Sequence, residues 1–246
     1  RKYLCEPIHD VASMCPGPLL AKCRDPKLEL IDNAETFYNE EGEANGVFGQ
    51  HFIGHDPAIA SDKNADFTAM TVMRIKPDSD AKEIVHVVHE RGMSSMAQKR
   101  MMVLLNSKFS PELIELEGNN FQRMLEQEMR EMRADMPIRV FMTTRARKES
   151  LFMSLLLAFE QGHIKLPYER SRTYTHKIEQ ELNRFGMQKS GKLESVGVHD
   201  DLAMSLALAN WASKEFKGSV MLLDDYMPGF DDWFRGESGK DSILIP

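Results

Sequence analysis

The sequence predicts an α/β protein with a mixed central sheet, in which three antiparallel strands are followed by parallel strands and helices flank the sheet. Two features of the 246-residue chain carry this prediction. Extended runs joined by short connections occupy residues 47–89, whereas extended runs alternate with helical patterns over residues 94–214. Short connections favour antiparallel pairing, and intervening helices are typical of parallel strands.

The three antiparallel strands are expected at residues 47–53, 67–75 and 83–89. The second run has an alternating pattern and contains β-branched and aromatic residues, as is typical of a strand. The link between the first two is rich in Pro, Ala, Ser, Asp and Asn, as is typical of a tight connection. Asp56 therefore stands at the exit of a central strand, where a carboxylate needs partners because an unpaired buried charge is costly.

The second half alternates helices with strands. Apolar residues three and four apart predict helices over residues 94–109, 121–132, 148–161, 174–186 and 202–214. Strands are expected at residues 113–117 and 138–142. Gly162 is placed to end the third helix, and the acids before Leu202 suit the positive end of a helix dipole.

Composition limits the class of protein. Hydrophobic residues make up 42% and charged residues 28% of the chain, which is ordinary for a soluble globular protein. A net charge of −7 argues against a general nucleic-acid coat but permits a nucleic-acid enzyme whose metal-binding acids lower the total. No apolar run approaches the roughly eighteen residues of a membrane span. No signal-peptide core is present either.

The cysteines lie together near the start of the chain, at Cys5, Cys15 and Cys23, with His9 among them. An odd number of cysteines fits a reducing compartment, and their spacing matches none of the close pairs of zinc sites. We therefore favour free thiols. A zinc site or a small zinc enzyme is the alternative, and it requires that these four residues converge.

Three groups of acids occupy special positions: Asp56 after the first strand, Glu117 at the end of the fourth, and Asp200 with Asp201 before the last helix. If the first and fourth strands are parallel neighbours, their carboxyl ends meet where open α/β sheets hold ligands. Oxygen ligands favour Mg²⁺ or Mn²⁺, and two such ions about 4 Å apart support phosphodiester cleavage. Each acid taken alone is more often a cap or a solvent-facing residue than a catalytic one. It is their joint placement that indicates a site.

Four segments in this order resemble the nuclease domain of the large terminase subunit of tailed bacteriophages, within the RNase H-like superfamily. They are GHDPAIASDKNADFTAM (54–70), LIELEGNNFQ (113–122), KESLFMSLLLAFEQGHIKLP (148–167), and ELNRFG followed by HDDLAMSLALA (181–186 and 199–209). The resemblance covers residues 47–212 and implies an RNase H-like fold. The opening YLCEPI resembles the segment after the family's ATPase domain, so we expect the chain to be part of a longer protein.

The resemblance also assigns roles to residues. The catalytic and metal-binding residues would be Asp56, Glu117, Asp200 and Asp201, and the sequence leaves open which of the last two reaches the metal and whether Mg²⁺ or Mn²⁺ is preferred. The supporting residues would be Asp66, His199 and Asn119. By charge alone, Arg145, Arg147 and Lys148 are expected to contact DNA phosphates, with a solvated helix face as the alternative.

The implied activity is that of a metal-dependent endonuclease that cleaves concatemeric double-stranded DNA by two-metal-ion hydrolysis during viral packaging. The implied partners are double-stranded DNA, the ATPase domain, the capsid portal and the small terminase subunit, with no membrane. The location would be the host bacterial cytoplasm and, transiently, the procapsid portal. We expect a connecting segment at 1–46, the nuclease domain at 47–215 and a C-terminal tail at 216–246. The alternatives are another RNase H-like nuclease, such as a resolvase or transposase core, and a non-catalytic DNA-binding or scaffold module.

Overall fold

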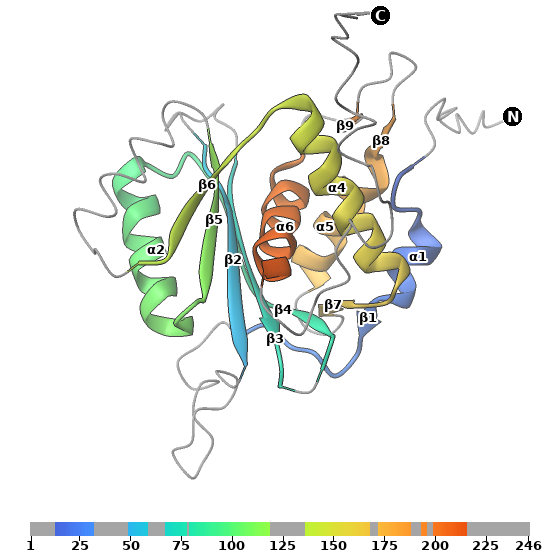
Figure 1. The fold of residues 1–246 in the computed structure, drawn as a ribbon, viewed down its shortest axis with the longest axis horizontal. Coiled ribbons are helices and arrows are strands. Elements are labelled where there is room, and N and C mark those ends of the chain that lie inside the picture. The colour runs from blue at the N-terminus through green and yellow to red at the C-terminus, as the bar shows by residue number, and fades with distance from the viewer. Residues whose placement is uncertain are drawn as a thin grey trace, which may run out of the picture.

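The computed structural model describes residues 13–31, 49–58, 67–77, 79–118, 136–167, 172–187, 193–195 and 199–215. A mixed seven-stranded sheet has helix α2 (Ser95–Phe109) on one face and α4 (Arg145–Glu160), α5 (Arg172–Arg184) and α6 (Asp201–Ala212) on the other (Figure 1). The strand order is β1 (Arg24–Asp25), β7 (Ile164–Pro167), β4 (Lys82–Arg91), β3 (Phe67–Ile75), β2 (Gln50–Asp56), β5 (Leu113–Gly118) and β6 (Ile138–Met142).

The pairing of the central strands confirms the predicted sheet. Strands β2, β3 and β4 form the antiparallel meander, and β5 and β6 follow on the other side of β2 as parallel strands. The bounds of β3 and β6 are those expected from the sequence. Strand β2 is shifted toward the carboxyl end of its predicted range and includes Asp56 as its last residue.

Local capping fixes the ends of the helices. Ser94 accepts a hydrogen bond from the Ala97 N–H at 3.2 Å and starts α2, while Ser110 ends it in the left-handed conformation, with φ 44°. Thr144 accepts a hydrogen bond from the Arg147 N–H at 3.3 Å, so α4 starts at Arg145, before the predicted position. The helix predicted over residues 121–132 lies outside the described residues.

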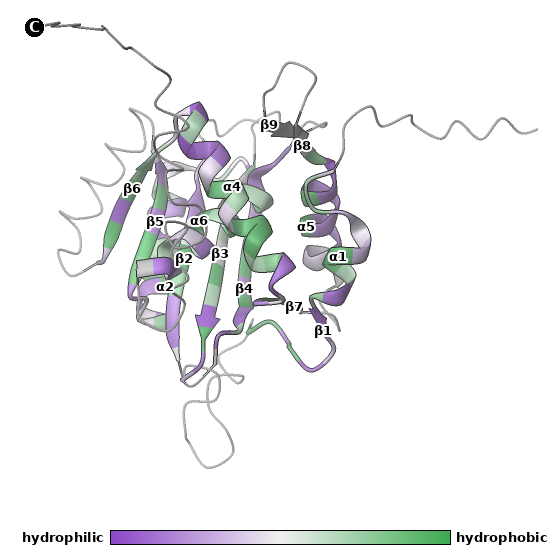
Figure 2. Cartoon of the chain, turned by 45° about the vertical axis from the view of Figure 1, so that its right-hand side comes forward, coloured by the Kyte–Doolittle hydropathy of each residue, from purple (hydrophilic) through white to green (hydrophobic). Residues whose placement is uncertain are grey.

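Helix α6 is the central helix of the fold, because it lies between the sheet and helices α4 and α5 (Figure 1). Every residue of α6 except Trp211 is buried, as expected for a helix that is apolar all round. By contrast, hydrophilic and hydrophobic residues alternate along α5 (Figure 2), whose Ile178 and Leu182 enter the core. None of the described helices is both long and apolar enough to cross a membrane.

Gly54 of β2 permits the close approach of α6 to the sheet. A Cβ atom at this position would lie 1.9 Å from the Ser205 carbonyl oxygen and 2.5 Å from the Ala209 nitrogen, both of them backbone atoms. A glycine in a strand interior often marks such an approach of another backbone. The Thr71 and Ser205 hydroxyls, 2.8 Å apart, add a buried hydrogen bond between β3 and the same helix.

Several short elements of the fold were not predicted from the sequence. The helix predicted to reach Gly186 ends at Arg184, and the chain then forms a hairpin of β8 (Phe185–Met187) and β9 (Leu193–Ser195). Within the predicted connecting segment, α1 (Gly17–Lys22) precedes β1, which pairs in parallel with β7. Residues 13–31 therefore pack against the rest of the domain, while the domain boundaries themselves stay predictions.

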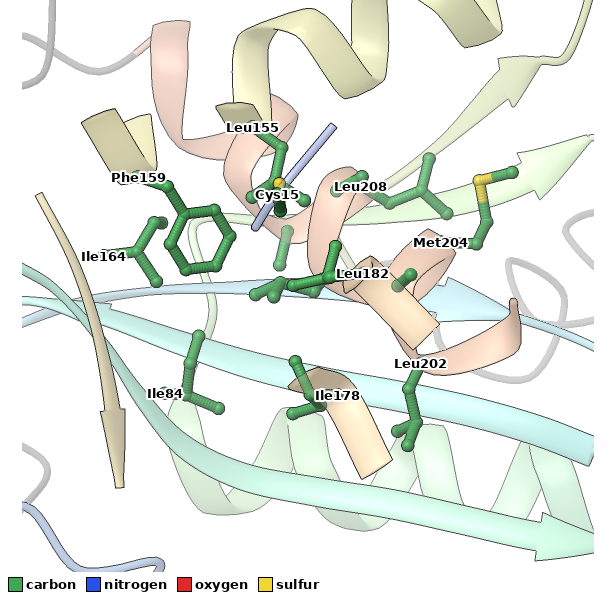
Figure 3. Close-up of a cluster of buried hydrophobic side chains, with 14 of the residues drawn as sticks. Cys15, Ile84, Leu155, Phe159, Ile164, Ile178, Leu182, Leu202, Met204 and Leu208 are labelled. Atoms are coloured by element: carbon green, nitrogen blue, oxygen red, sulfur yellow. The ribbon is translucent and has the colours of Figure 1, made fainter. Parts of the chain in front are cut away.

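Two of the three cysteines belong to this packing. Cys15 lies in the core with Leu155, Phe159 and Leu182 (Figure 3), and burial raises the pKa of its thiol to about 12. The Cys23 thiol donates to the Phe159 carbonyl oxygen at 3.5 Å. Both are free thiols that pack as small apolar side chains. The other two residues of the zinc alternative, Cys5 and His9, lie outside the described residues.

Candidate active site

The strand ends that carry the first two acids lie side by side. Strands β2 and β5 are parallel neighbours in a register that pairs His55 with Leu116, so the next residues along, Asp56 and Glu117, are adjacent. This confirms the neighbour relation that the sequence prediction required. Both acids stand at the carboxyl edge of the sheet, where ligands of open α/β sheets bind.

Helix α6 brings the third group of acids to the same edge. Asp200 occupies its N-cap position without a capping side-chain hydrogen bond, and Asp201 is its first residue. Because α6 packs directly over Gly54, its N-terminus lies close to the end of β2. Three segments far apart in the sequence therefore place carboxylates at one point.

The electrostatics of Asp56 show how closely these groups approach. Burial raises the pKa of Asp56 well above its usual range, and the charges of Glu117, Asp201 and Asp200 raise it further. A side-chain hydrogen bond with Glu117 also raises the pKa of Asp56. Clustered like charges with a strongly perturbed pKa are typical of functional sites.

Lys148 of α4 reaches into this cluster. Its Nζ donates to Asp200 Oδ2 at 2.9 Å, so the lysine expected to contact DNA also neutralises one of the candidate metal ligands. The two late aspartates thus differ in their surroundings. Asp201 is only 8% exposed, whereas the Asp200 side chain is about a third exposed, at 32%, and is held by Lys148.

The remaining predicted residues fall into two groups. His199 Nδ1 lies 3.6 Å from Asp201 Oδ2, beside the acids. Arg145 and Arg147 are exposed on the first turn of α4, where Arg145 pairs with Glu149 at 3.0 Å and the Arg147 guanidinium lies 4.3 Å from the centre of the Phe141 ring. Asp66 and Asn119 lie outside the described residues.

Glu181 of α5 is a further acid at this place, and it was not among the predicted site residues. Its Oε2 accepts a hydrogen bond from the Ala203 N–H at 2.9 Å and so caps α6 in place of Asp200. Burial raises the pKa of Glu181 to about 8; the backbone N–H groups of Ala203 and Leu202 oppose this rise, and Asp201 and Asp200 add to it. Glu181 lies within the ELNRFG segment, but no local pattern distinguishes it from Glu179.

The chemistry of this donor set fits a hard divalent cation, since the converging ligands are carboxylate oxygens. Among the residues that the structure describes, no group of three His, Cys, Asp or Glu side chains is already placed to hold a metal ion. Instead, Asp200 is held by Lys148, and Asp56 shares a hydrogen bond with Glu117. A bound cation would relieve the repulsion that raises the pKa of Asp56.

A mixed sheet whose central parallel strands end in clustered acids, with an acidic helix N-terminus beside them, defines an RNase H-like domain. Residues 53–211 match the family of the terminase RNase H-like domain, so the chain belongs to this family. A comparison with curated protein sequences gave no match.

Solved structures of low sequence identity share the fold. The large terminase nuclease of thermophilic phage G20c with bound magnesium aligns with a TM-score of 0.59 and 19% identity, covering 81% of this chain and 97% of that chain. The nuclease domain of Thermus phage P74-26 aligns with a TM-score of 0.56, 21% identity and coverages of 83% and 97%. A variant nuclease domain from bacterial virus Sf6 with manganese aligns with a TM-score of 0.57 and 12% identity, covering 80% of this chain and 98% of that chain. These matches confirm the predicted RNase H-like fold.

Proposed function

We propose that this chain is a metal-dependent DNA endonuclease that cleaves concatemeric double-stranded DNA as the nuclease domain of a large terminase. The observation that carries the proposal is the convergence of Asp56, Glu117 and the Asp200–Asp201 pair from three segments, close enough to raise the pKa of Asp56. Membership of the terminase family supports the reaction class. The bound magnesium and manganese in the G20c and Sf6 proteins support a divalent cofactor.

In this proposal the acids provide the metal ligands. Asp56, Glu117 and Asp201 would supply oxygens from the sheet edge and the buried helix end, with Asp200 available when Lys148 moves to a phosphate. The chemistry that these ligands would gain from a pair of divalent ions is Lewis acidity toward a water and the leaving oxygen. Glu181 holds the N-terminus of α6 in position, and His199 lies where it can orient the Asp201 carboxylate.

The proposed partners follow from the same family. Double-stranded DNA would be held by phosphate contacts that include Arg145, Arg147 and Lys148, which makes binding sensitive to salt. An ATPase domain of the same polypeptide, the capsid portal and the small terminase subunit would complete the packaging machine. The site of action would then be the host bacterial cytoplasm and the procapsid portal.

Plasmid digestion tests the proposal. We expect nicking and linearisation in Mg²⁺ or Mn²⁺, loss of both in EDTA, and loss of both in Asp56→Asn. The matched control is Asp80→Asn, an exposed aspartate in the β3–β4 connection at the opposite end of the sheet, which should cleave like the wild type.

Two outcomes would contradict this proposal. Cleavage that survives in Asp56→Asn would show that the acids described above are not the active site. An absence of cleavage with every metal, together with retained DNA binding, would instead favour the non-catalytic binding module.

A further inference from the structure

A group of aromatic and cationic side chains lies at the same edge of the sheet as the acids, on the side away from Glu117. Phe67 begins β3, Arg91 ends β4, His89 precedes it by two residues, and His199 comes just before α6. We refer to these four residues as the β3–β4 platform. None of its members on β3 and β4 was singled out in the sequence.

The strand register places this platform beside Asp56. Asp56 pairs with Ala69, Ala69 pairs with His89, and Phe67 pairs with Arg91. Directly paired residues point to the same face of a sheet. That face is the one covered by α6, since Ala69 packs in its core cluster. The platform and the acids therefore share one face and one edge.

Phe67 supports the guanidinium of Arg91. The His89 ring stacks on Phe67 with centroids 4.1 Å apart and planes at 15°, and the guanidinium carbon of Arg91 lies 4.4 Å from the same centroid. The His199 ring meets Phe67 edge-on at 5.2 Å, and its Nε2 lies 3.4 Å from Arg91 Nη2. Arg91 is exposed, yet Phe67 and His199 already contact its guanidinium, so it should lose less conformational entropy on binding an anion than an unsupported arginine would.

A second cation lies near the platform. The pKa of His89 is lowered to about 4, mainly by burial and then by the charges of Lys177, His199 and Arg91. Lys177 belongs to α5, so the positive charge at this place comes from two elements. With His89 neutral near pH 7, the positive charge at this place is that of the planar guanidinium of Arg91 and the amine of Lys177.

The opposite flank of the acids has a similar arrangement. Arg147 lies over the ring of Phe141, and Phe141 pairs in register with Glu117 on β6. Along this edge of the sheet, Arg147 on Phe141 comes first and the acids Glu117 and Asp56 follow. Arg91 on Phe67 comes last. The carboxylates stand between two supported guanidinium groups.

We propose that Arg91 contacts a backbone phosphate of DNA and that DNA crosses the sheet edge from Arg147, over the acids, to Arg91. This inference rests on the proposed nuclease function and names a partner contact of the same site. A guanidinium matches the geometry of a phosphate. Strands β2 and β4 are two inter-strand spacings apart, about 10 Å. One DNA strand spans that distance in about three nucleotides at roughly 3.4 Å each.

The salt dependence of DNA binding tests this contact without requiring cleavage. Fluorescence anisotropy of a labelled 30-base-pair duplex would be measured in EDTA across a series of KCl concentrations. For Arg91→Gln we expect binding to weaken about eightfold near 0.1 M salt, and the slope of log K against log salt to fall by about 0.9, the contribution of one phosphate contact. Arg91→Lys keeps the charge, so it should keep most of the slope.

The matched control is Arg100→Gln, an exposed arginine of α2 on the opposite face of the sheet, which should leave the affinity and the slope unchanged. Lys177→Gln offers a second test on another element and should also lower the slope. Thermal unfolding of each variant shows whether it folds like the wild type.

The outcomes separate this inference from the proposed function. If the wild type binds and cleaves DNA but Arg91→Gln and Lys177→Gln leave the salt slope unchanged, the inference is wrong and the nuclease stands. Loss of cleavage in Arg91→Gln with an unchanged slope would also overturn it, since Arg91 would then act through His199. If the wild type neither binds nor cleaves DNA, both the proposed nuclease function and the Arg91 contact are wrong.

Discussion

Two rows of residues run side by side across β2, β5 and β6. Each row contains a glutamate of β5, and the two glutamates have different partners. In the first row Gly54 pairs with Glu115, which pairs with Arg139. The second row, two residues further along, places Asp56 beside Glu117, which pairs with Phe141. Both glutamates point to the same face, because residues two apart on a strand share one.

In the first row, an arginine neutralises the glutamate, and a glycine leaves space for the neighbouring helix. Glu115 is 1% exposed, and Arg139 donates to its Oε2 through Nε at 2.9 Å and Nη2 at 2.6 Å. Gly54 leaves room for α6 above it. The second row has a second carboxylate where the first has a glycine, and an aromatic ring where the first has an arginine. Within the described strands, therefore, no arginine pairs in register with the carboxylates of the second row, which lie at the edge where an added cation can bind.

The largest effect should come from removing the charge of the second row. Glu117→Gln removes one proposed metal ligand, and we expect plasmid cleavage in Mg²⁺ to fall more than about 100-fold, since even changes behind metal ligands cost 10–100-fold. The same change relieves repulsion on Asp56, so metal-free stability in urea unfolding should hold or rise. A variant that still cleaves at the wild-type rate would place the active site elsewhere.

Removing the charge of the first row should have the opposite pattern. Glu115→Gln leaves Arg139 without its buried carboxylate, and we expect a loss of about 2 kcal/mol in unfolding free energy. This is less than the roughly 3–5 kcal/mol of a fully buried pair, because Arg139 is partly exposed. Cleavage per folded molecule, measured well below the unfolding temperature, should persist. In the double variant Glu115→Leu with Arg139→Leu, much of the lost stability should return. A Glu115→Gln protein as stable as the wild type would contradict the assignment of this row to structure.

The sequence could predict that the acids of the second row meet, but not that the glutamate of the first row pairs with an arginine. Regular alternation and turn residues predicted β3 and β6, and the rule for carboxyl ends of parallel strands predicted that Asp56 and Glu117 meet. The Glu-Leu-Glu pattern of residues 115–117 does not say which glutamate faces an arginine. That depends on the register with β6, which is set by pairing across the fold.

Short strands and contacts between distant elements could not be predicted either, because they also depend on pairing across the fold. Strands β1 and β7 have two and four residues, too few to show a period, and they are strands only through pairing with each other and with β4. Glu179 and Glu181 lie two residues apart on α5, yet one pairs with Arg24 and the other caps α6. Lys148 was predicted from charge as a DNA contact, and its bond to Asp200 appears only when α4 and α6 come together.

The smallest expected effect is a dependence of the unfolding free energy on pH, which comes from the acids near the second row and not from the first row. The pKa of Asp56 and that of Glu181 are raised in the folded state, the latter from 4.5 to about 8, so between these values the folded protein binds more protons than the unfolded chain. Stability in EDTA should therefore fall as pH rises from 5 to 8, by at most about 1.4 kcal/mol per pH unit for each proton released. Glu181→Gln should flatten this fall in urea unfolding, and saturating Mg²⁺ should offset it. The first row offers the control: Arg139→Leu with Glu115→Leu should leave the slope as it is in the wild type. A slope that disappears in this double variant would mean that the raised pKa values of Asp56 and Glu181 do not cause it.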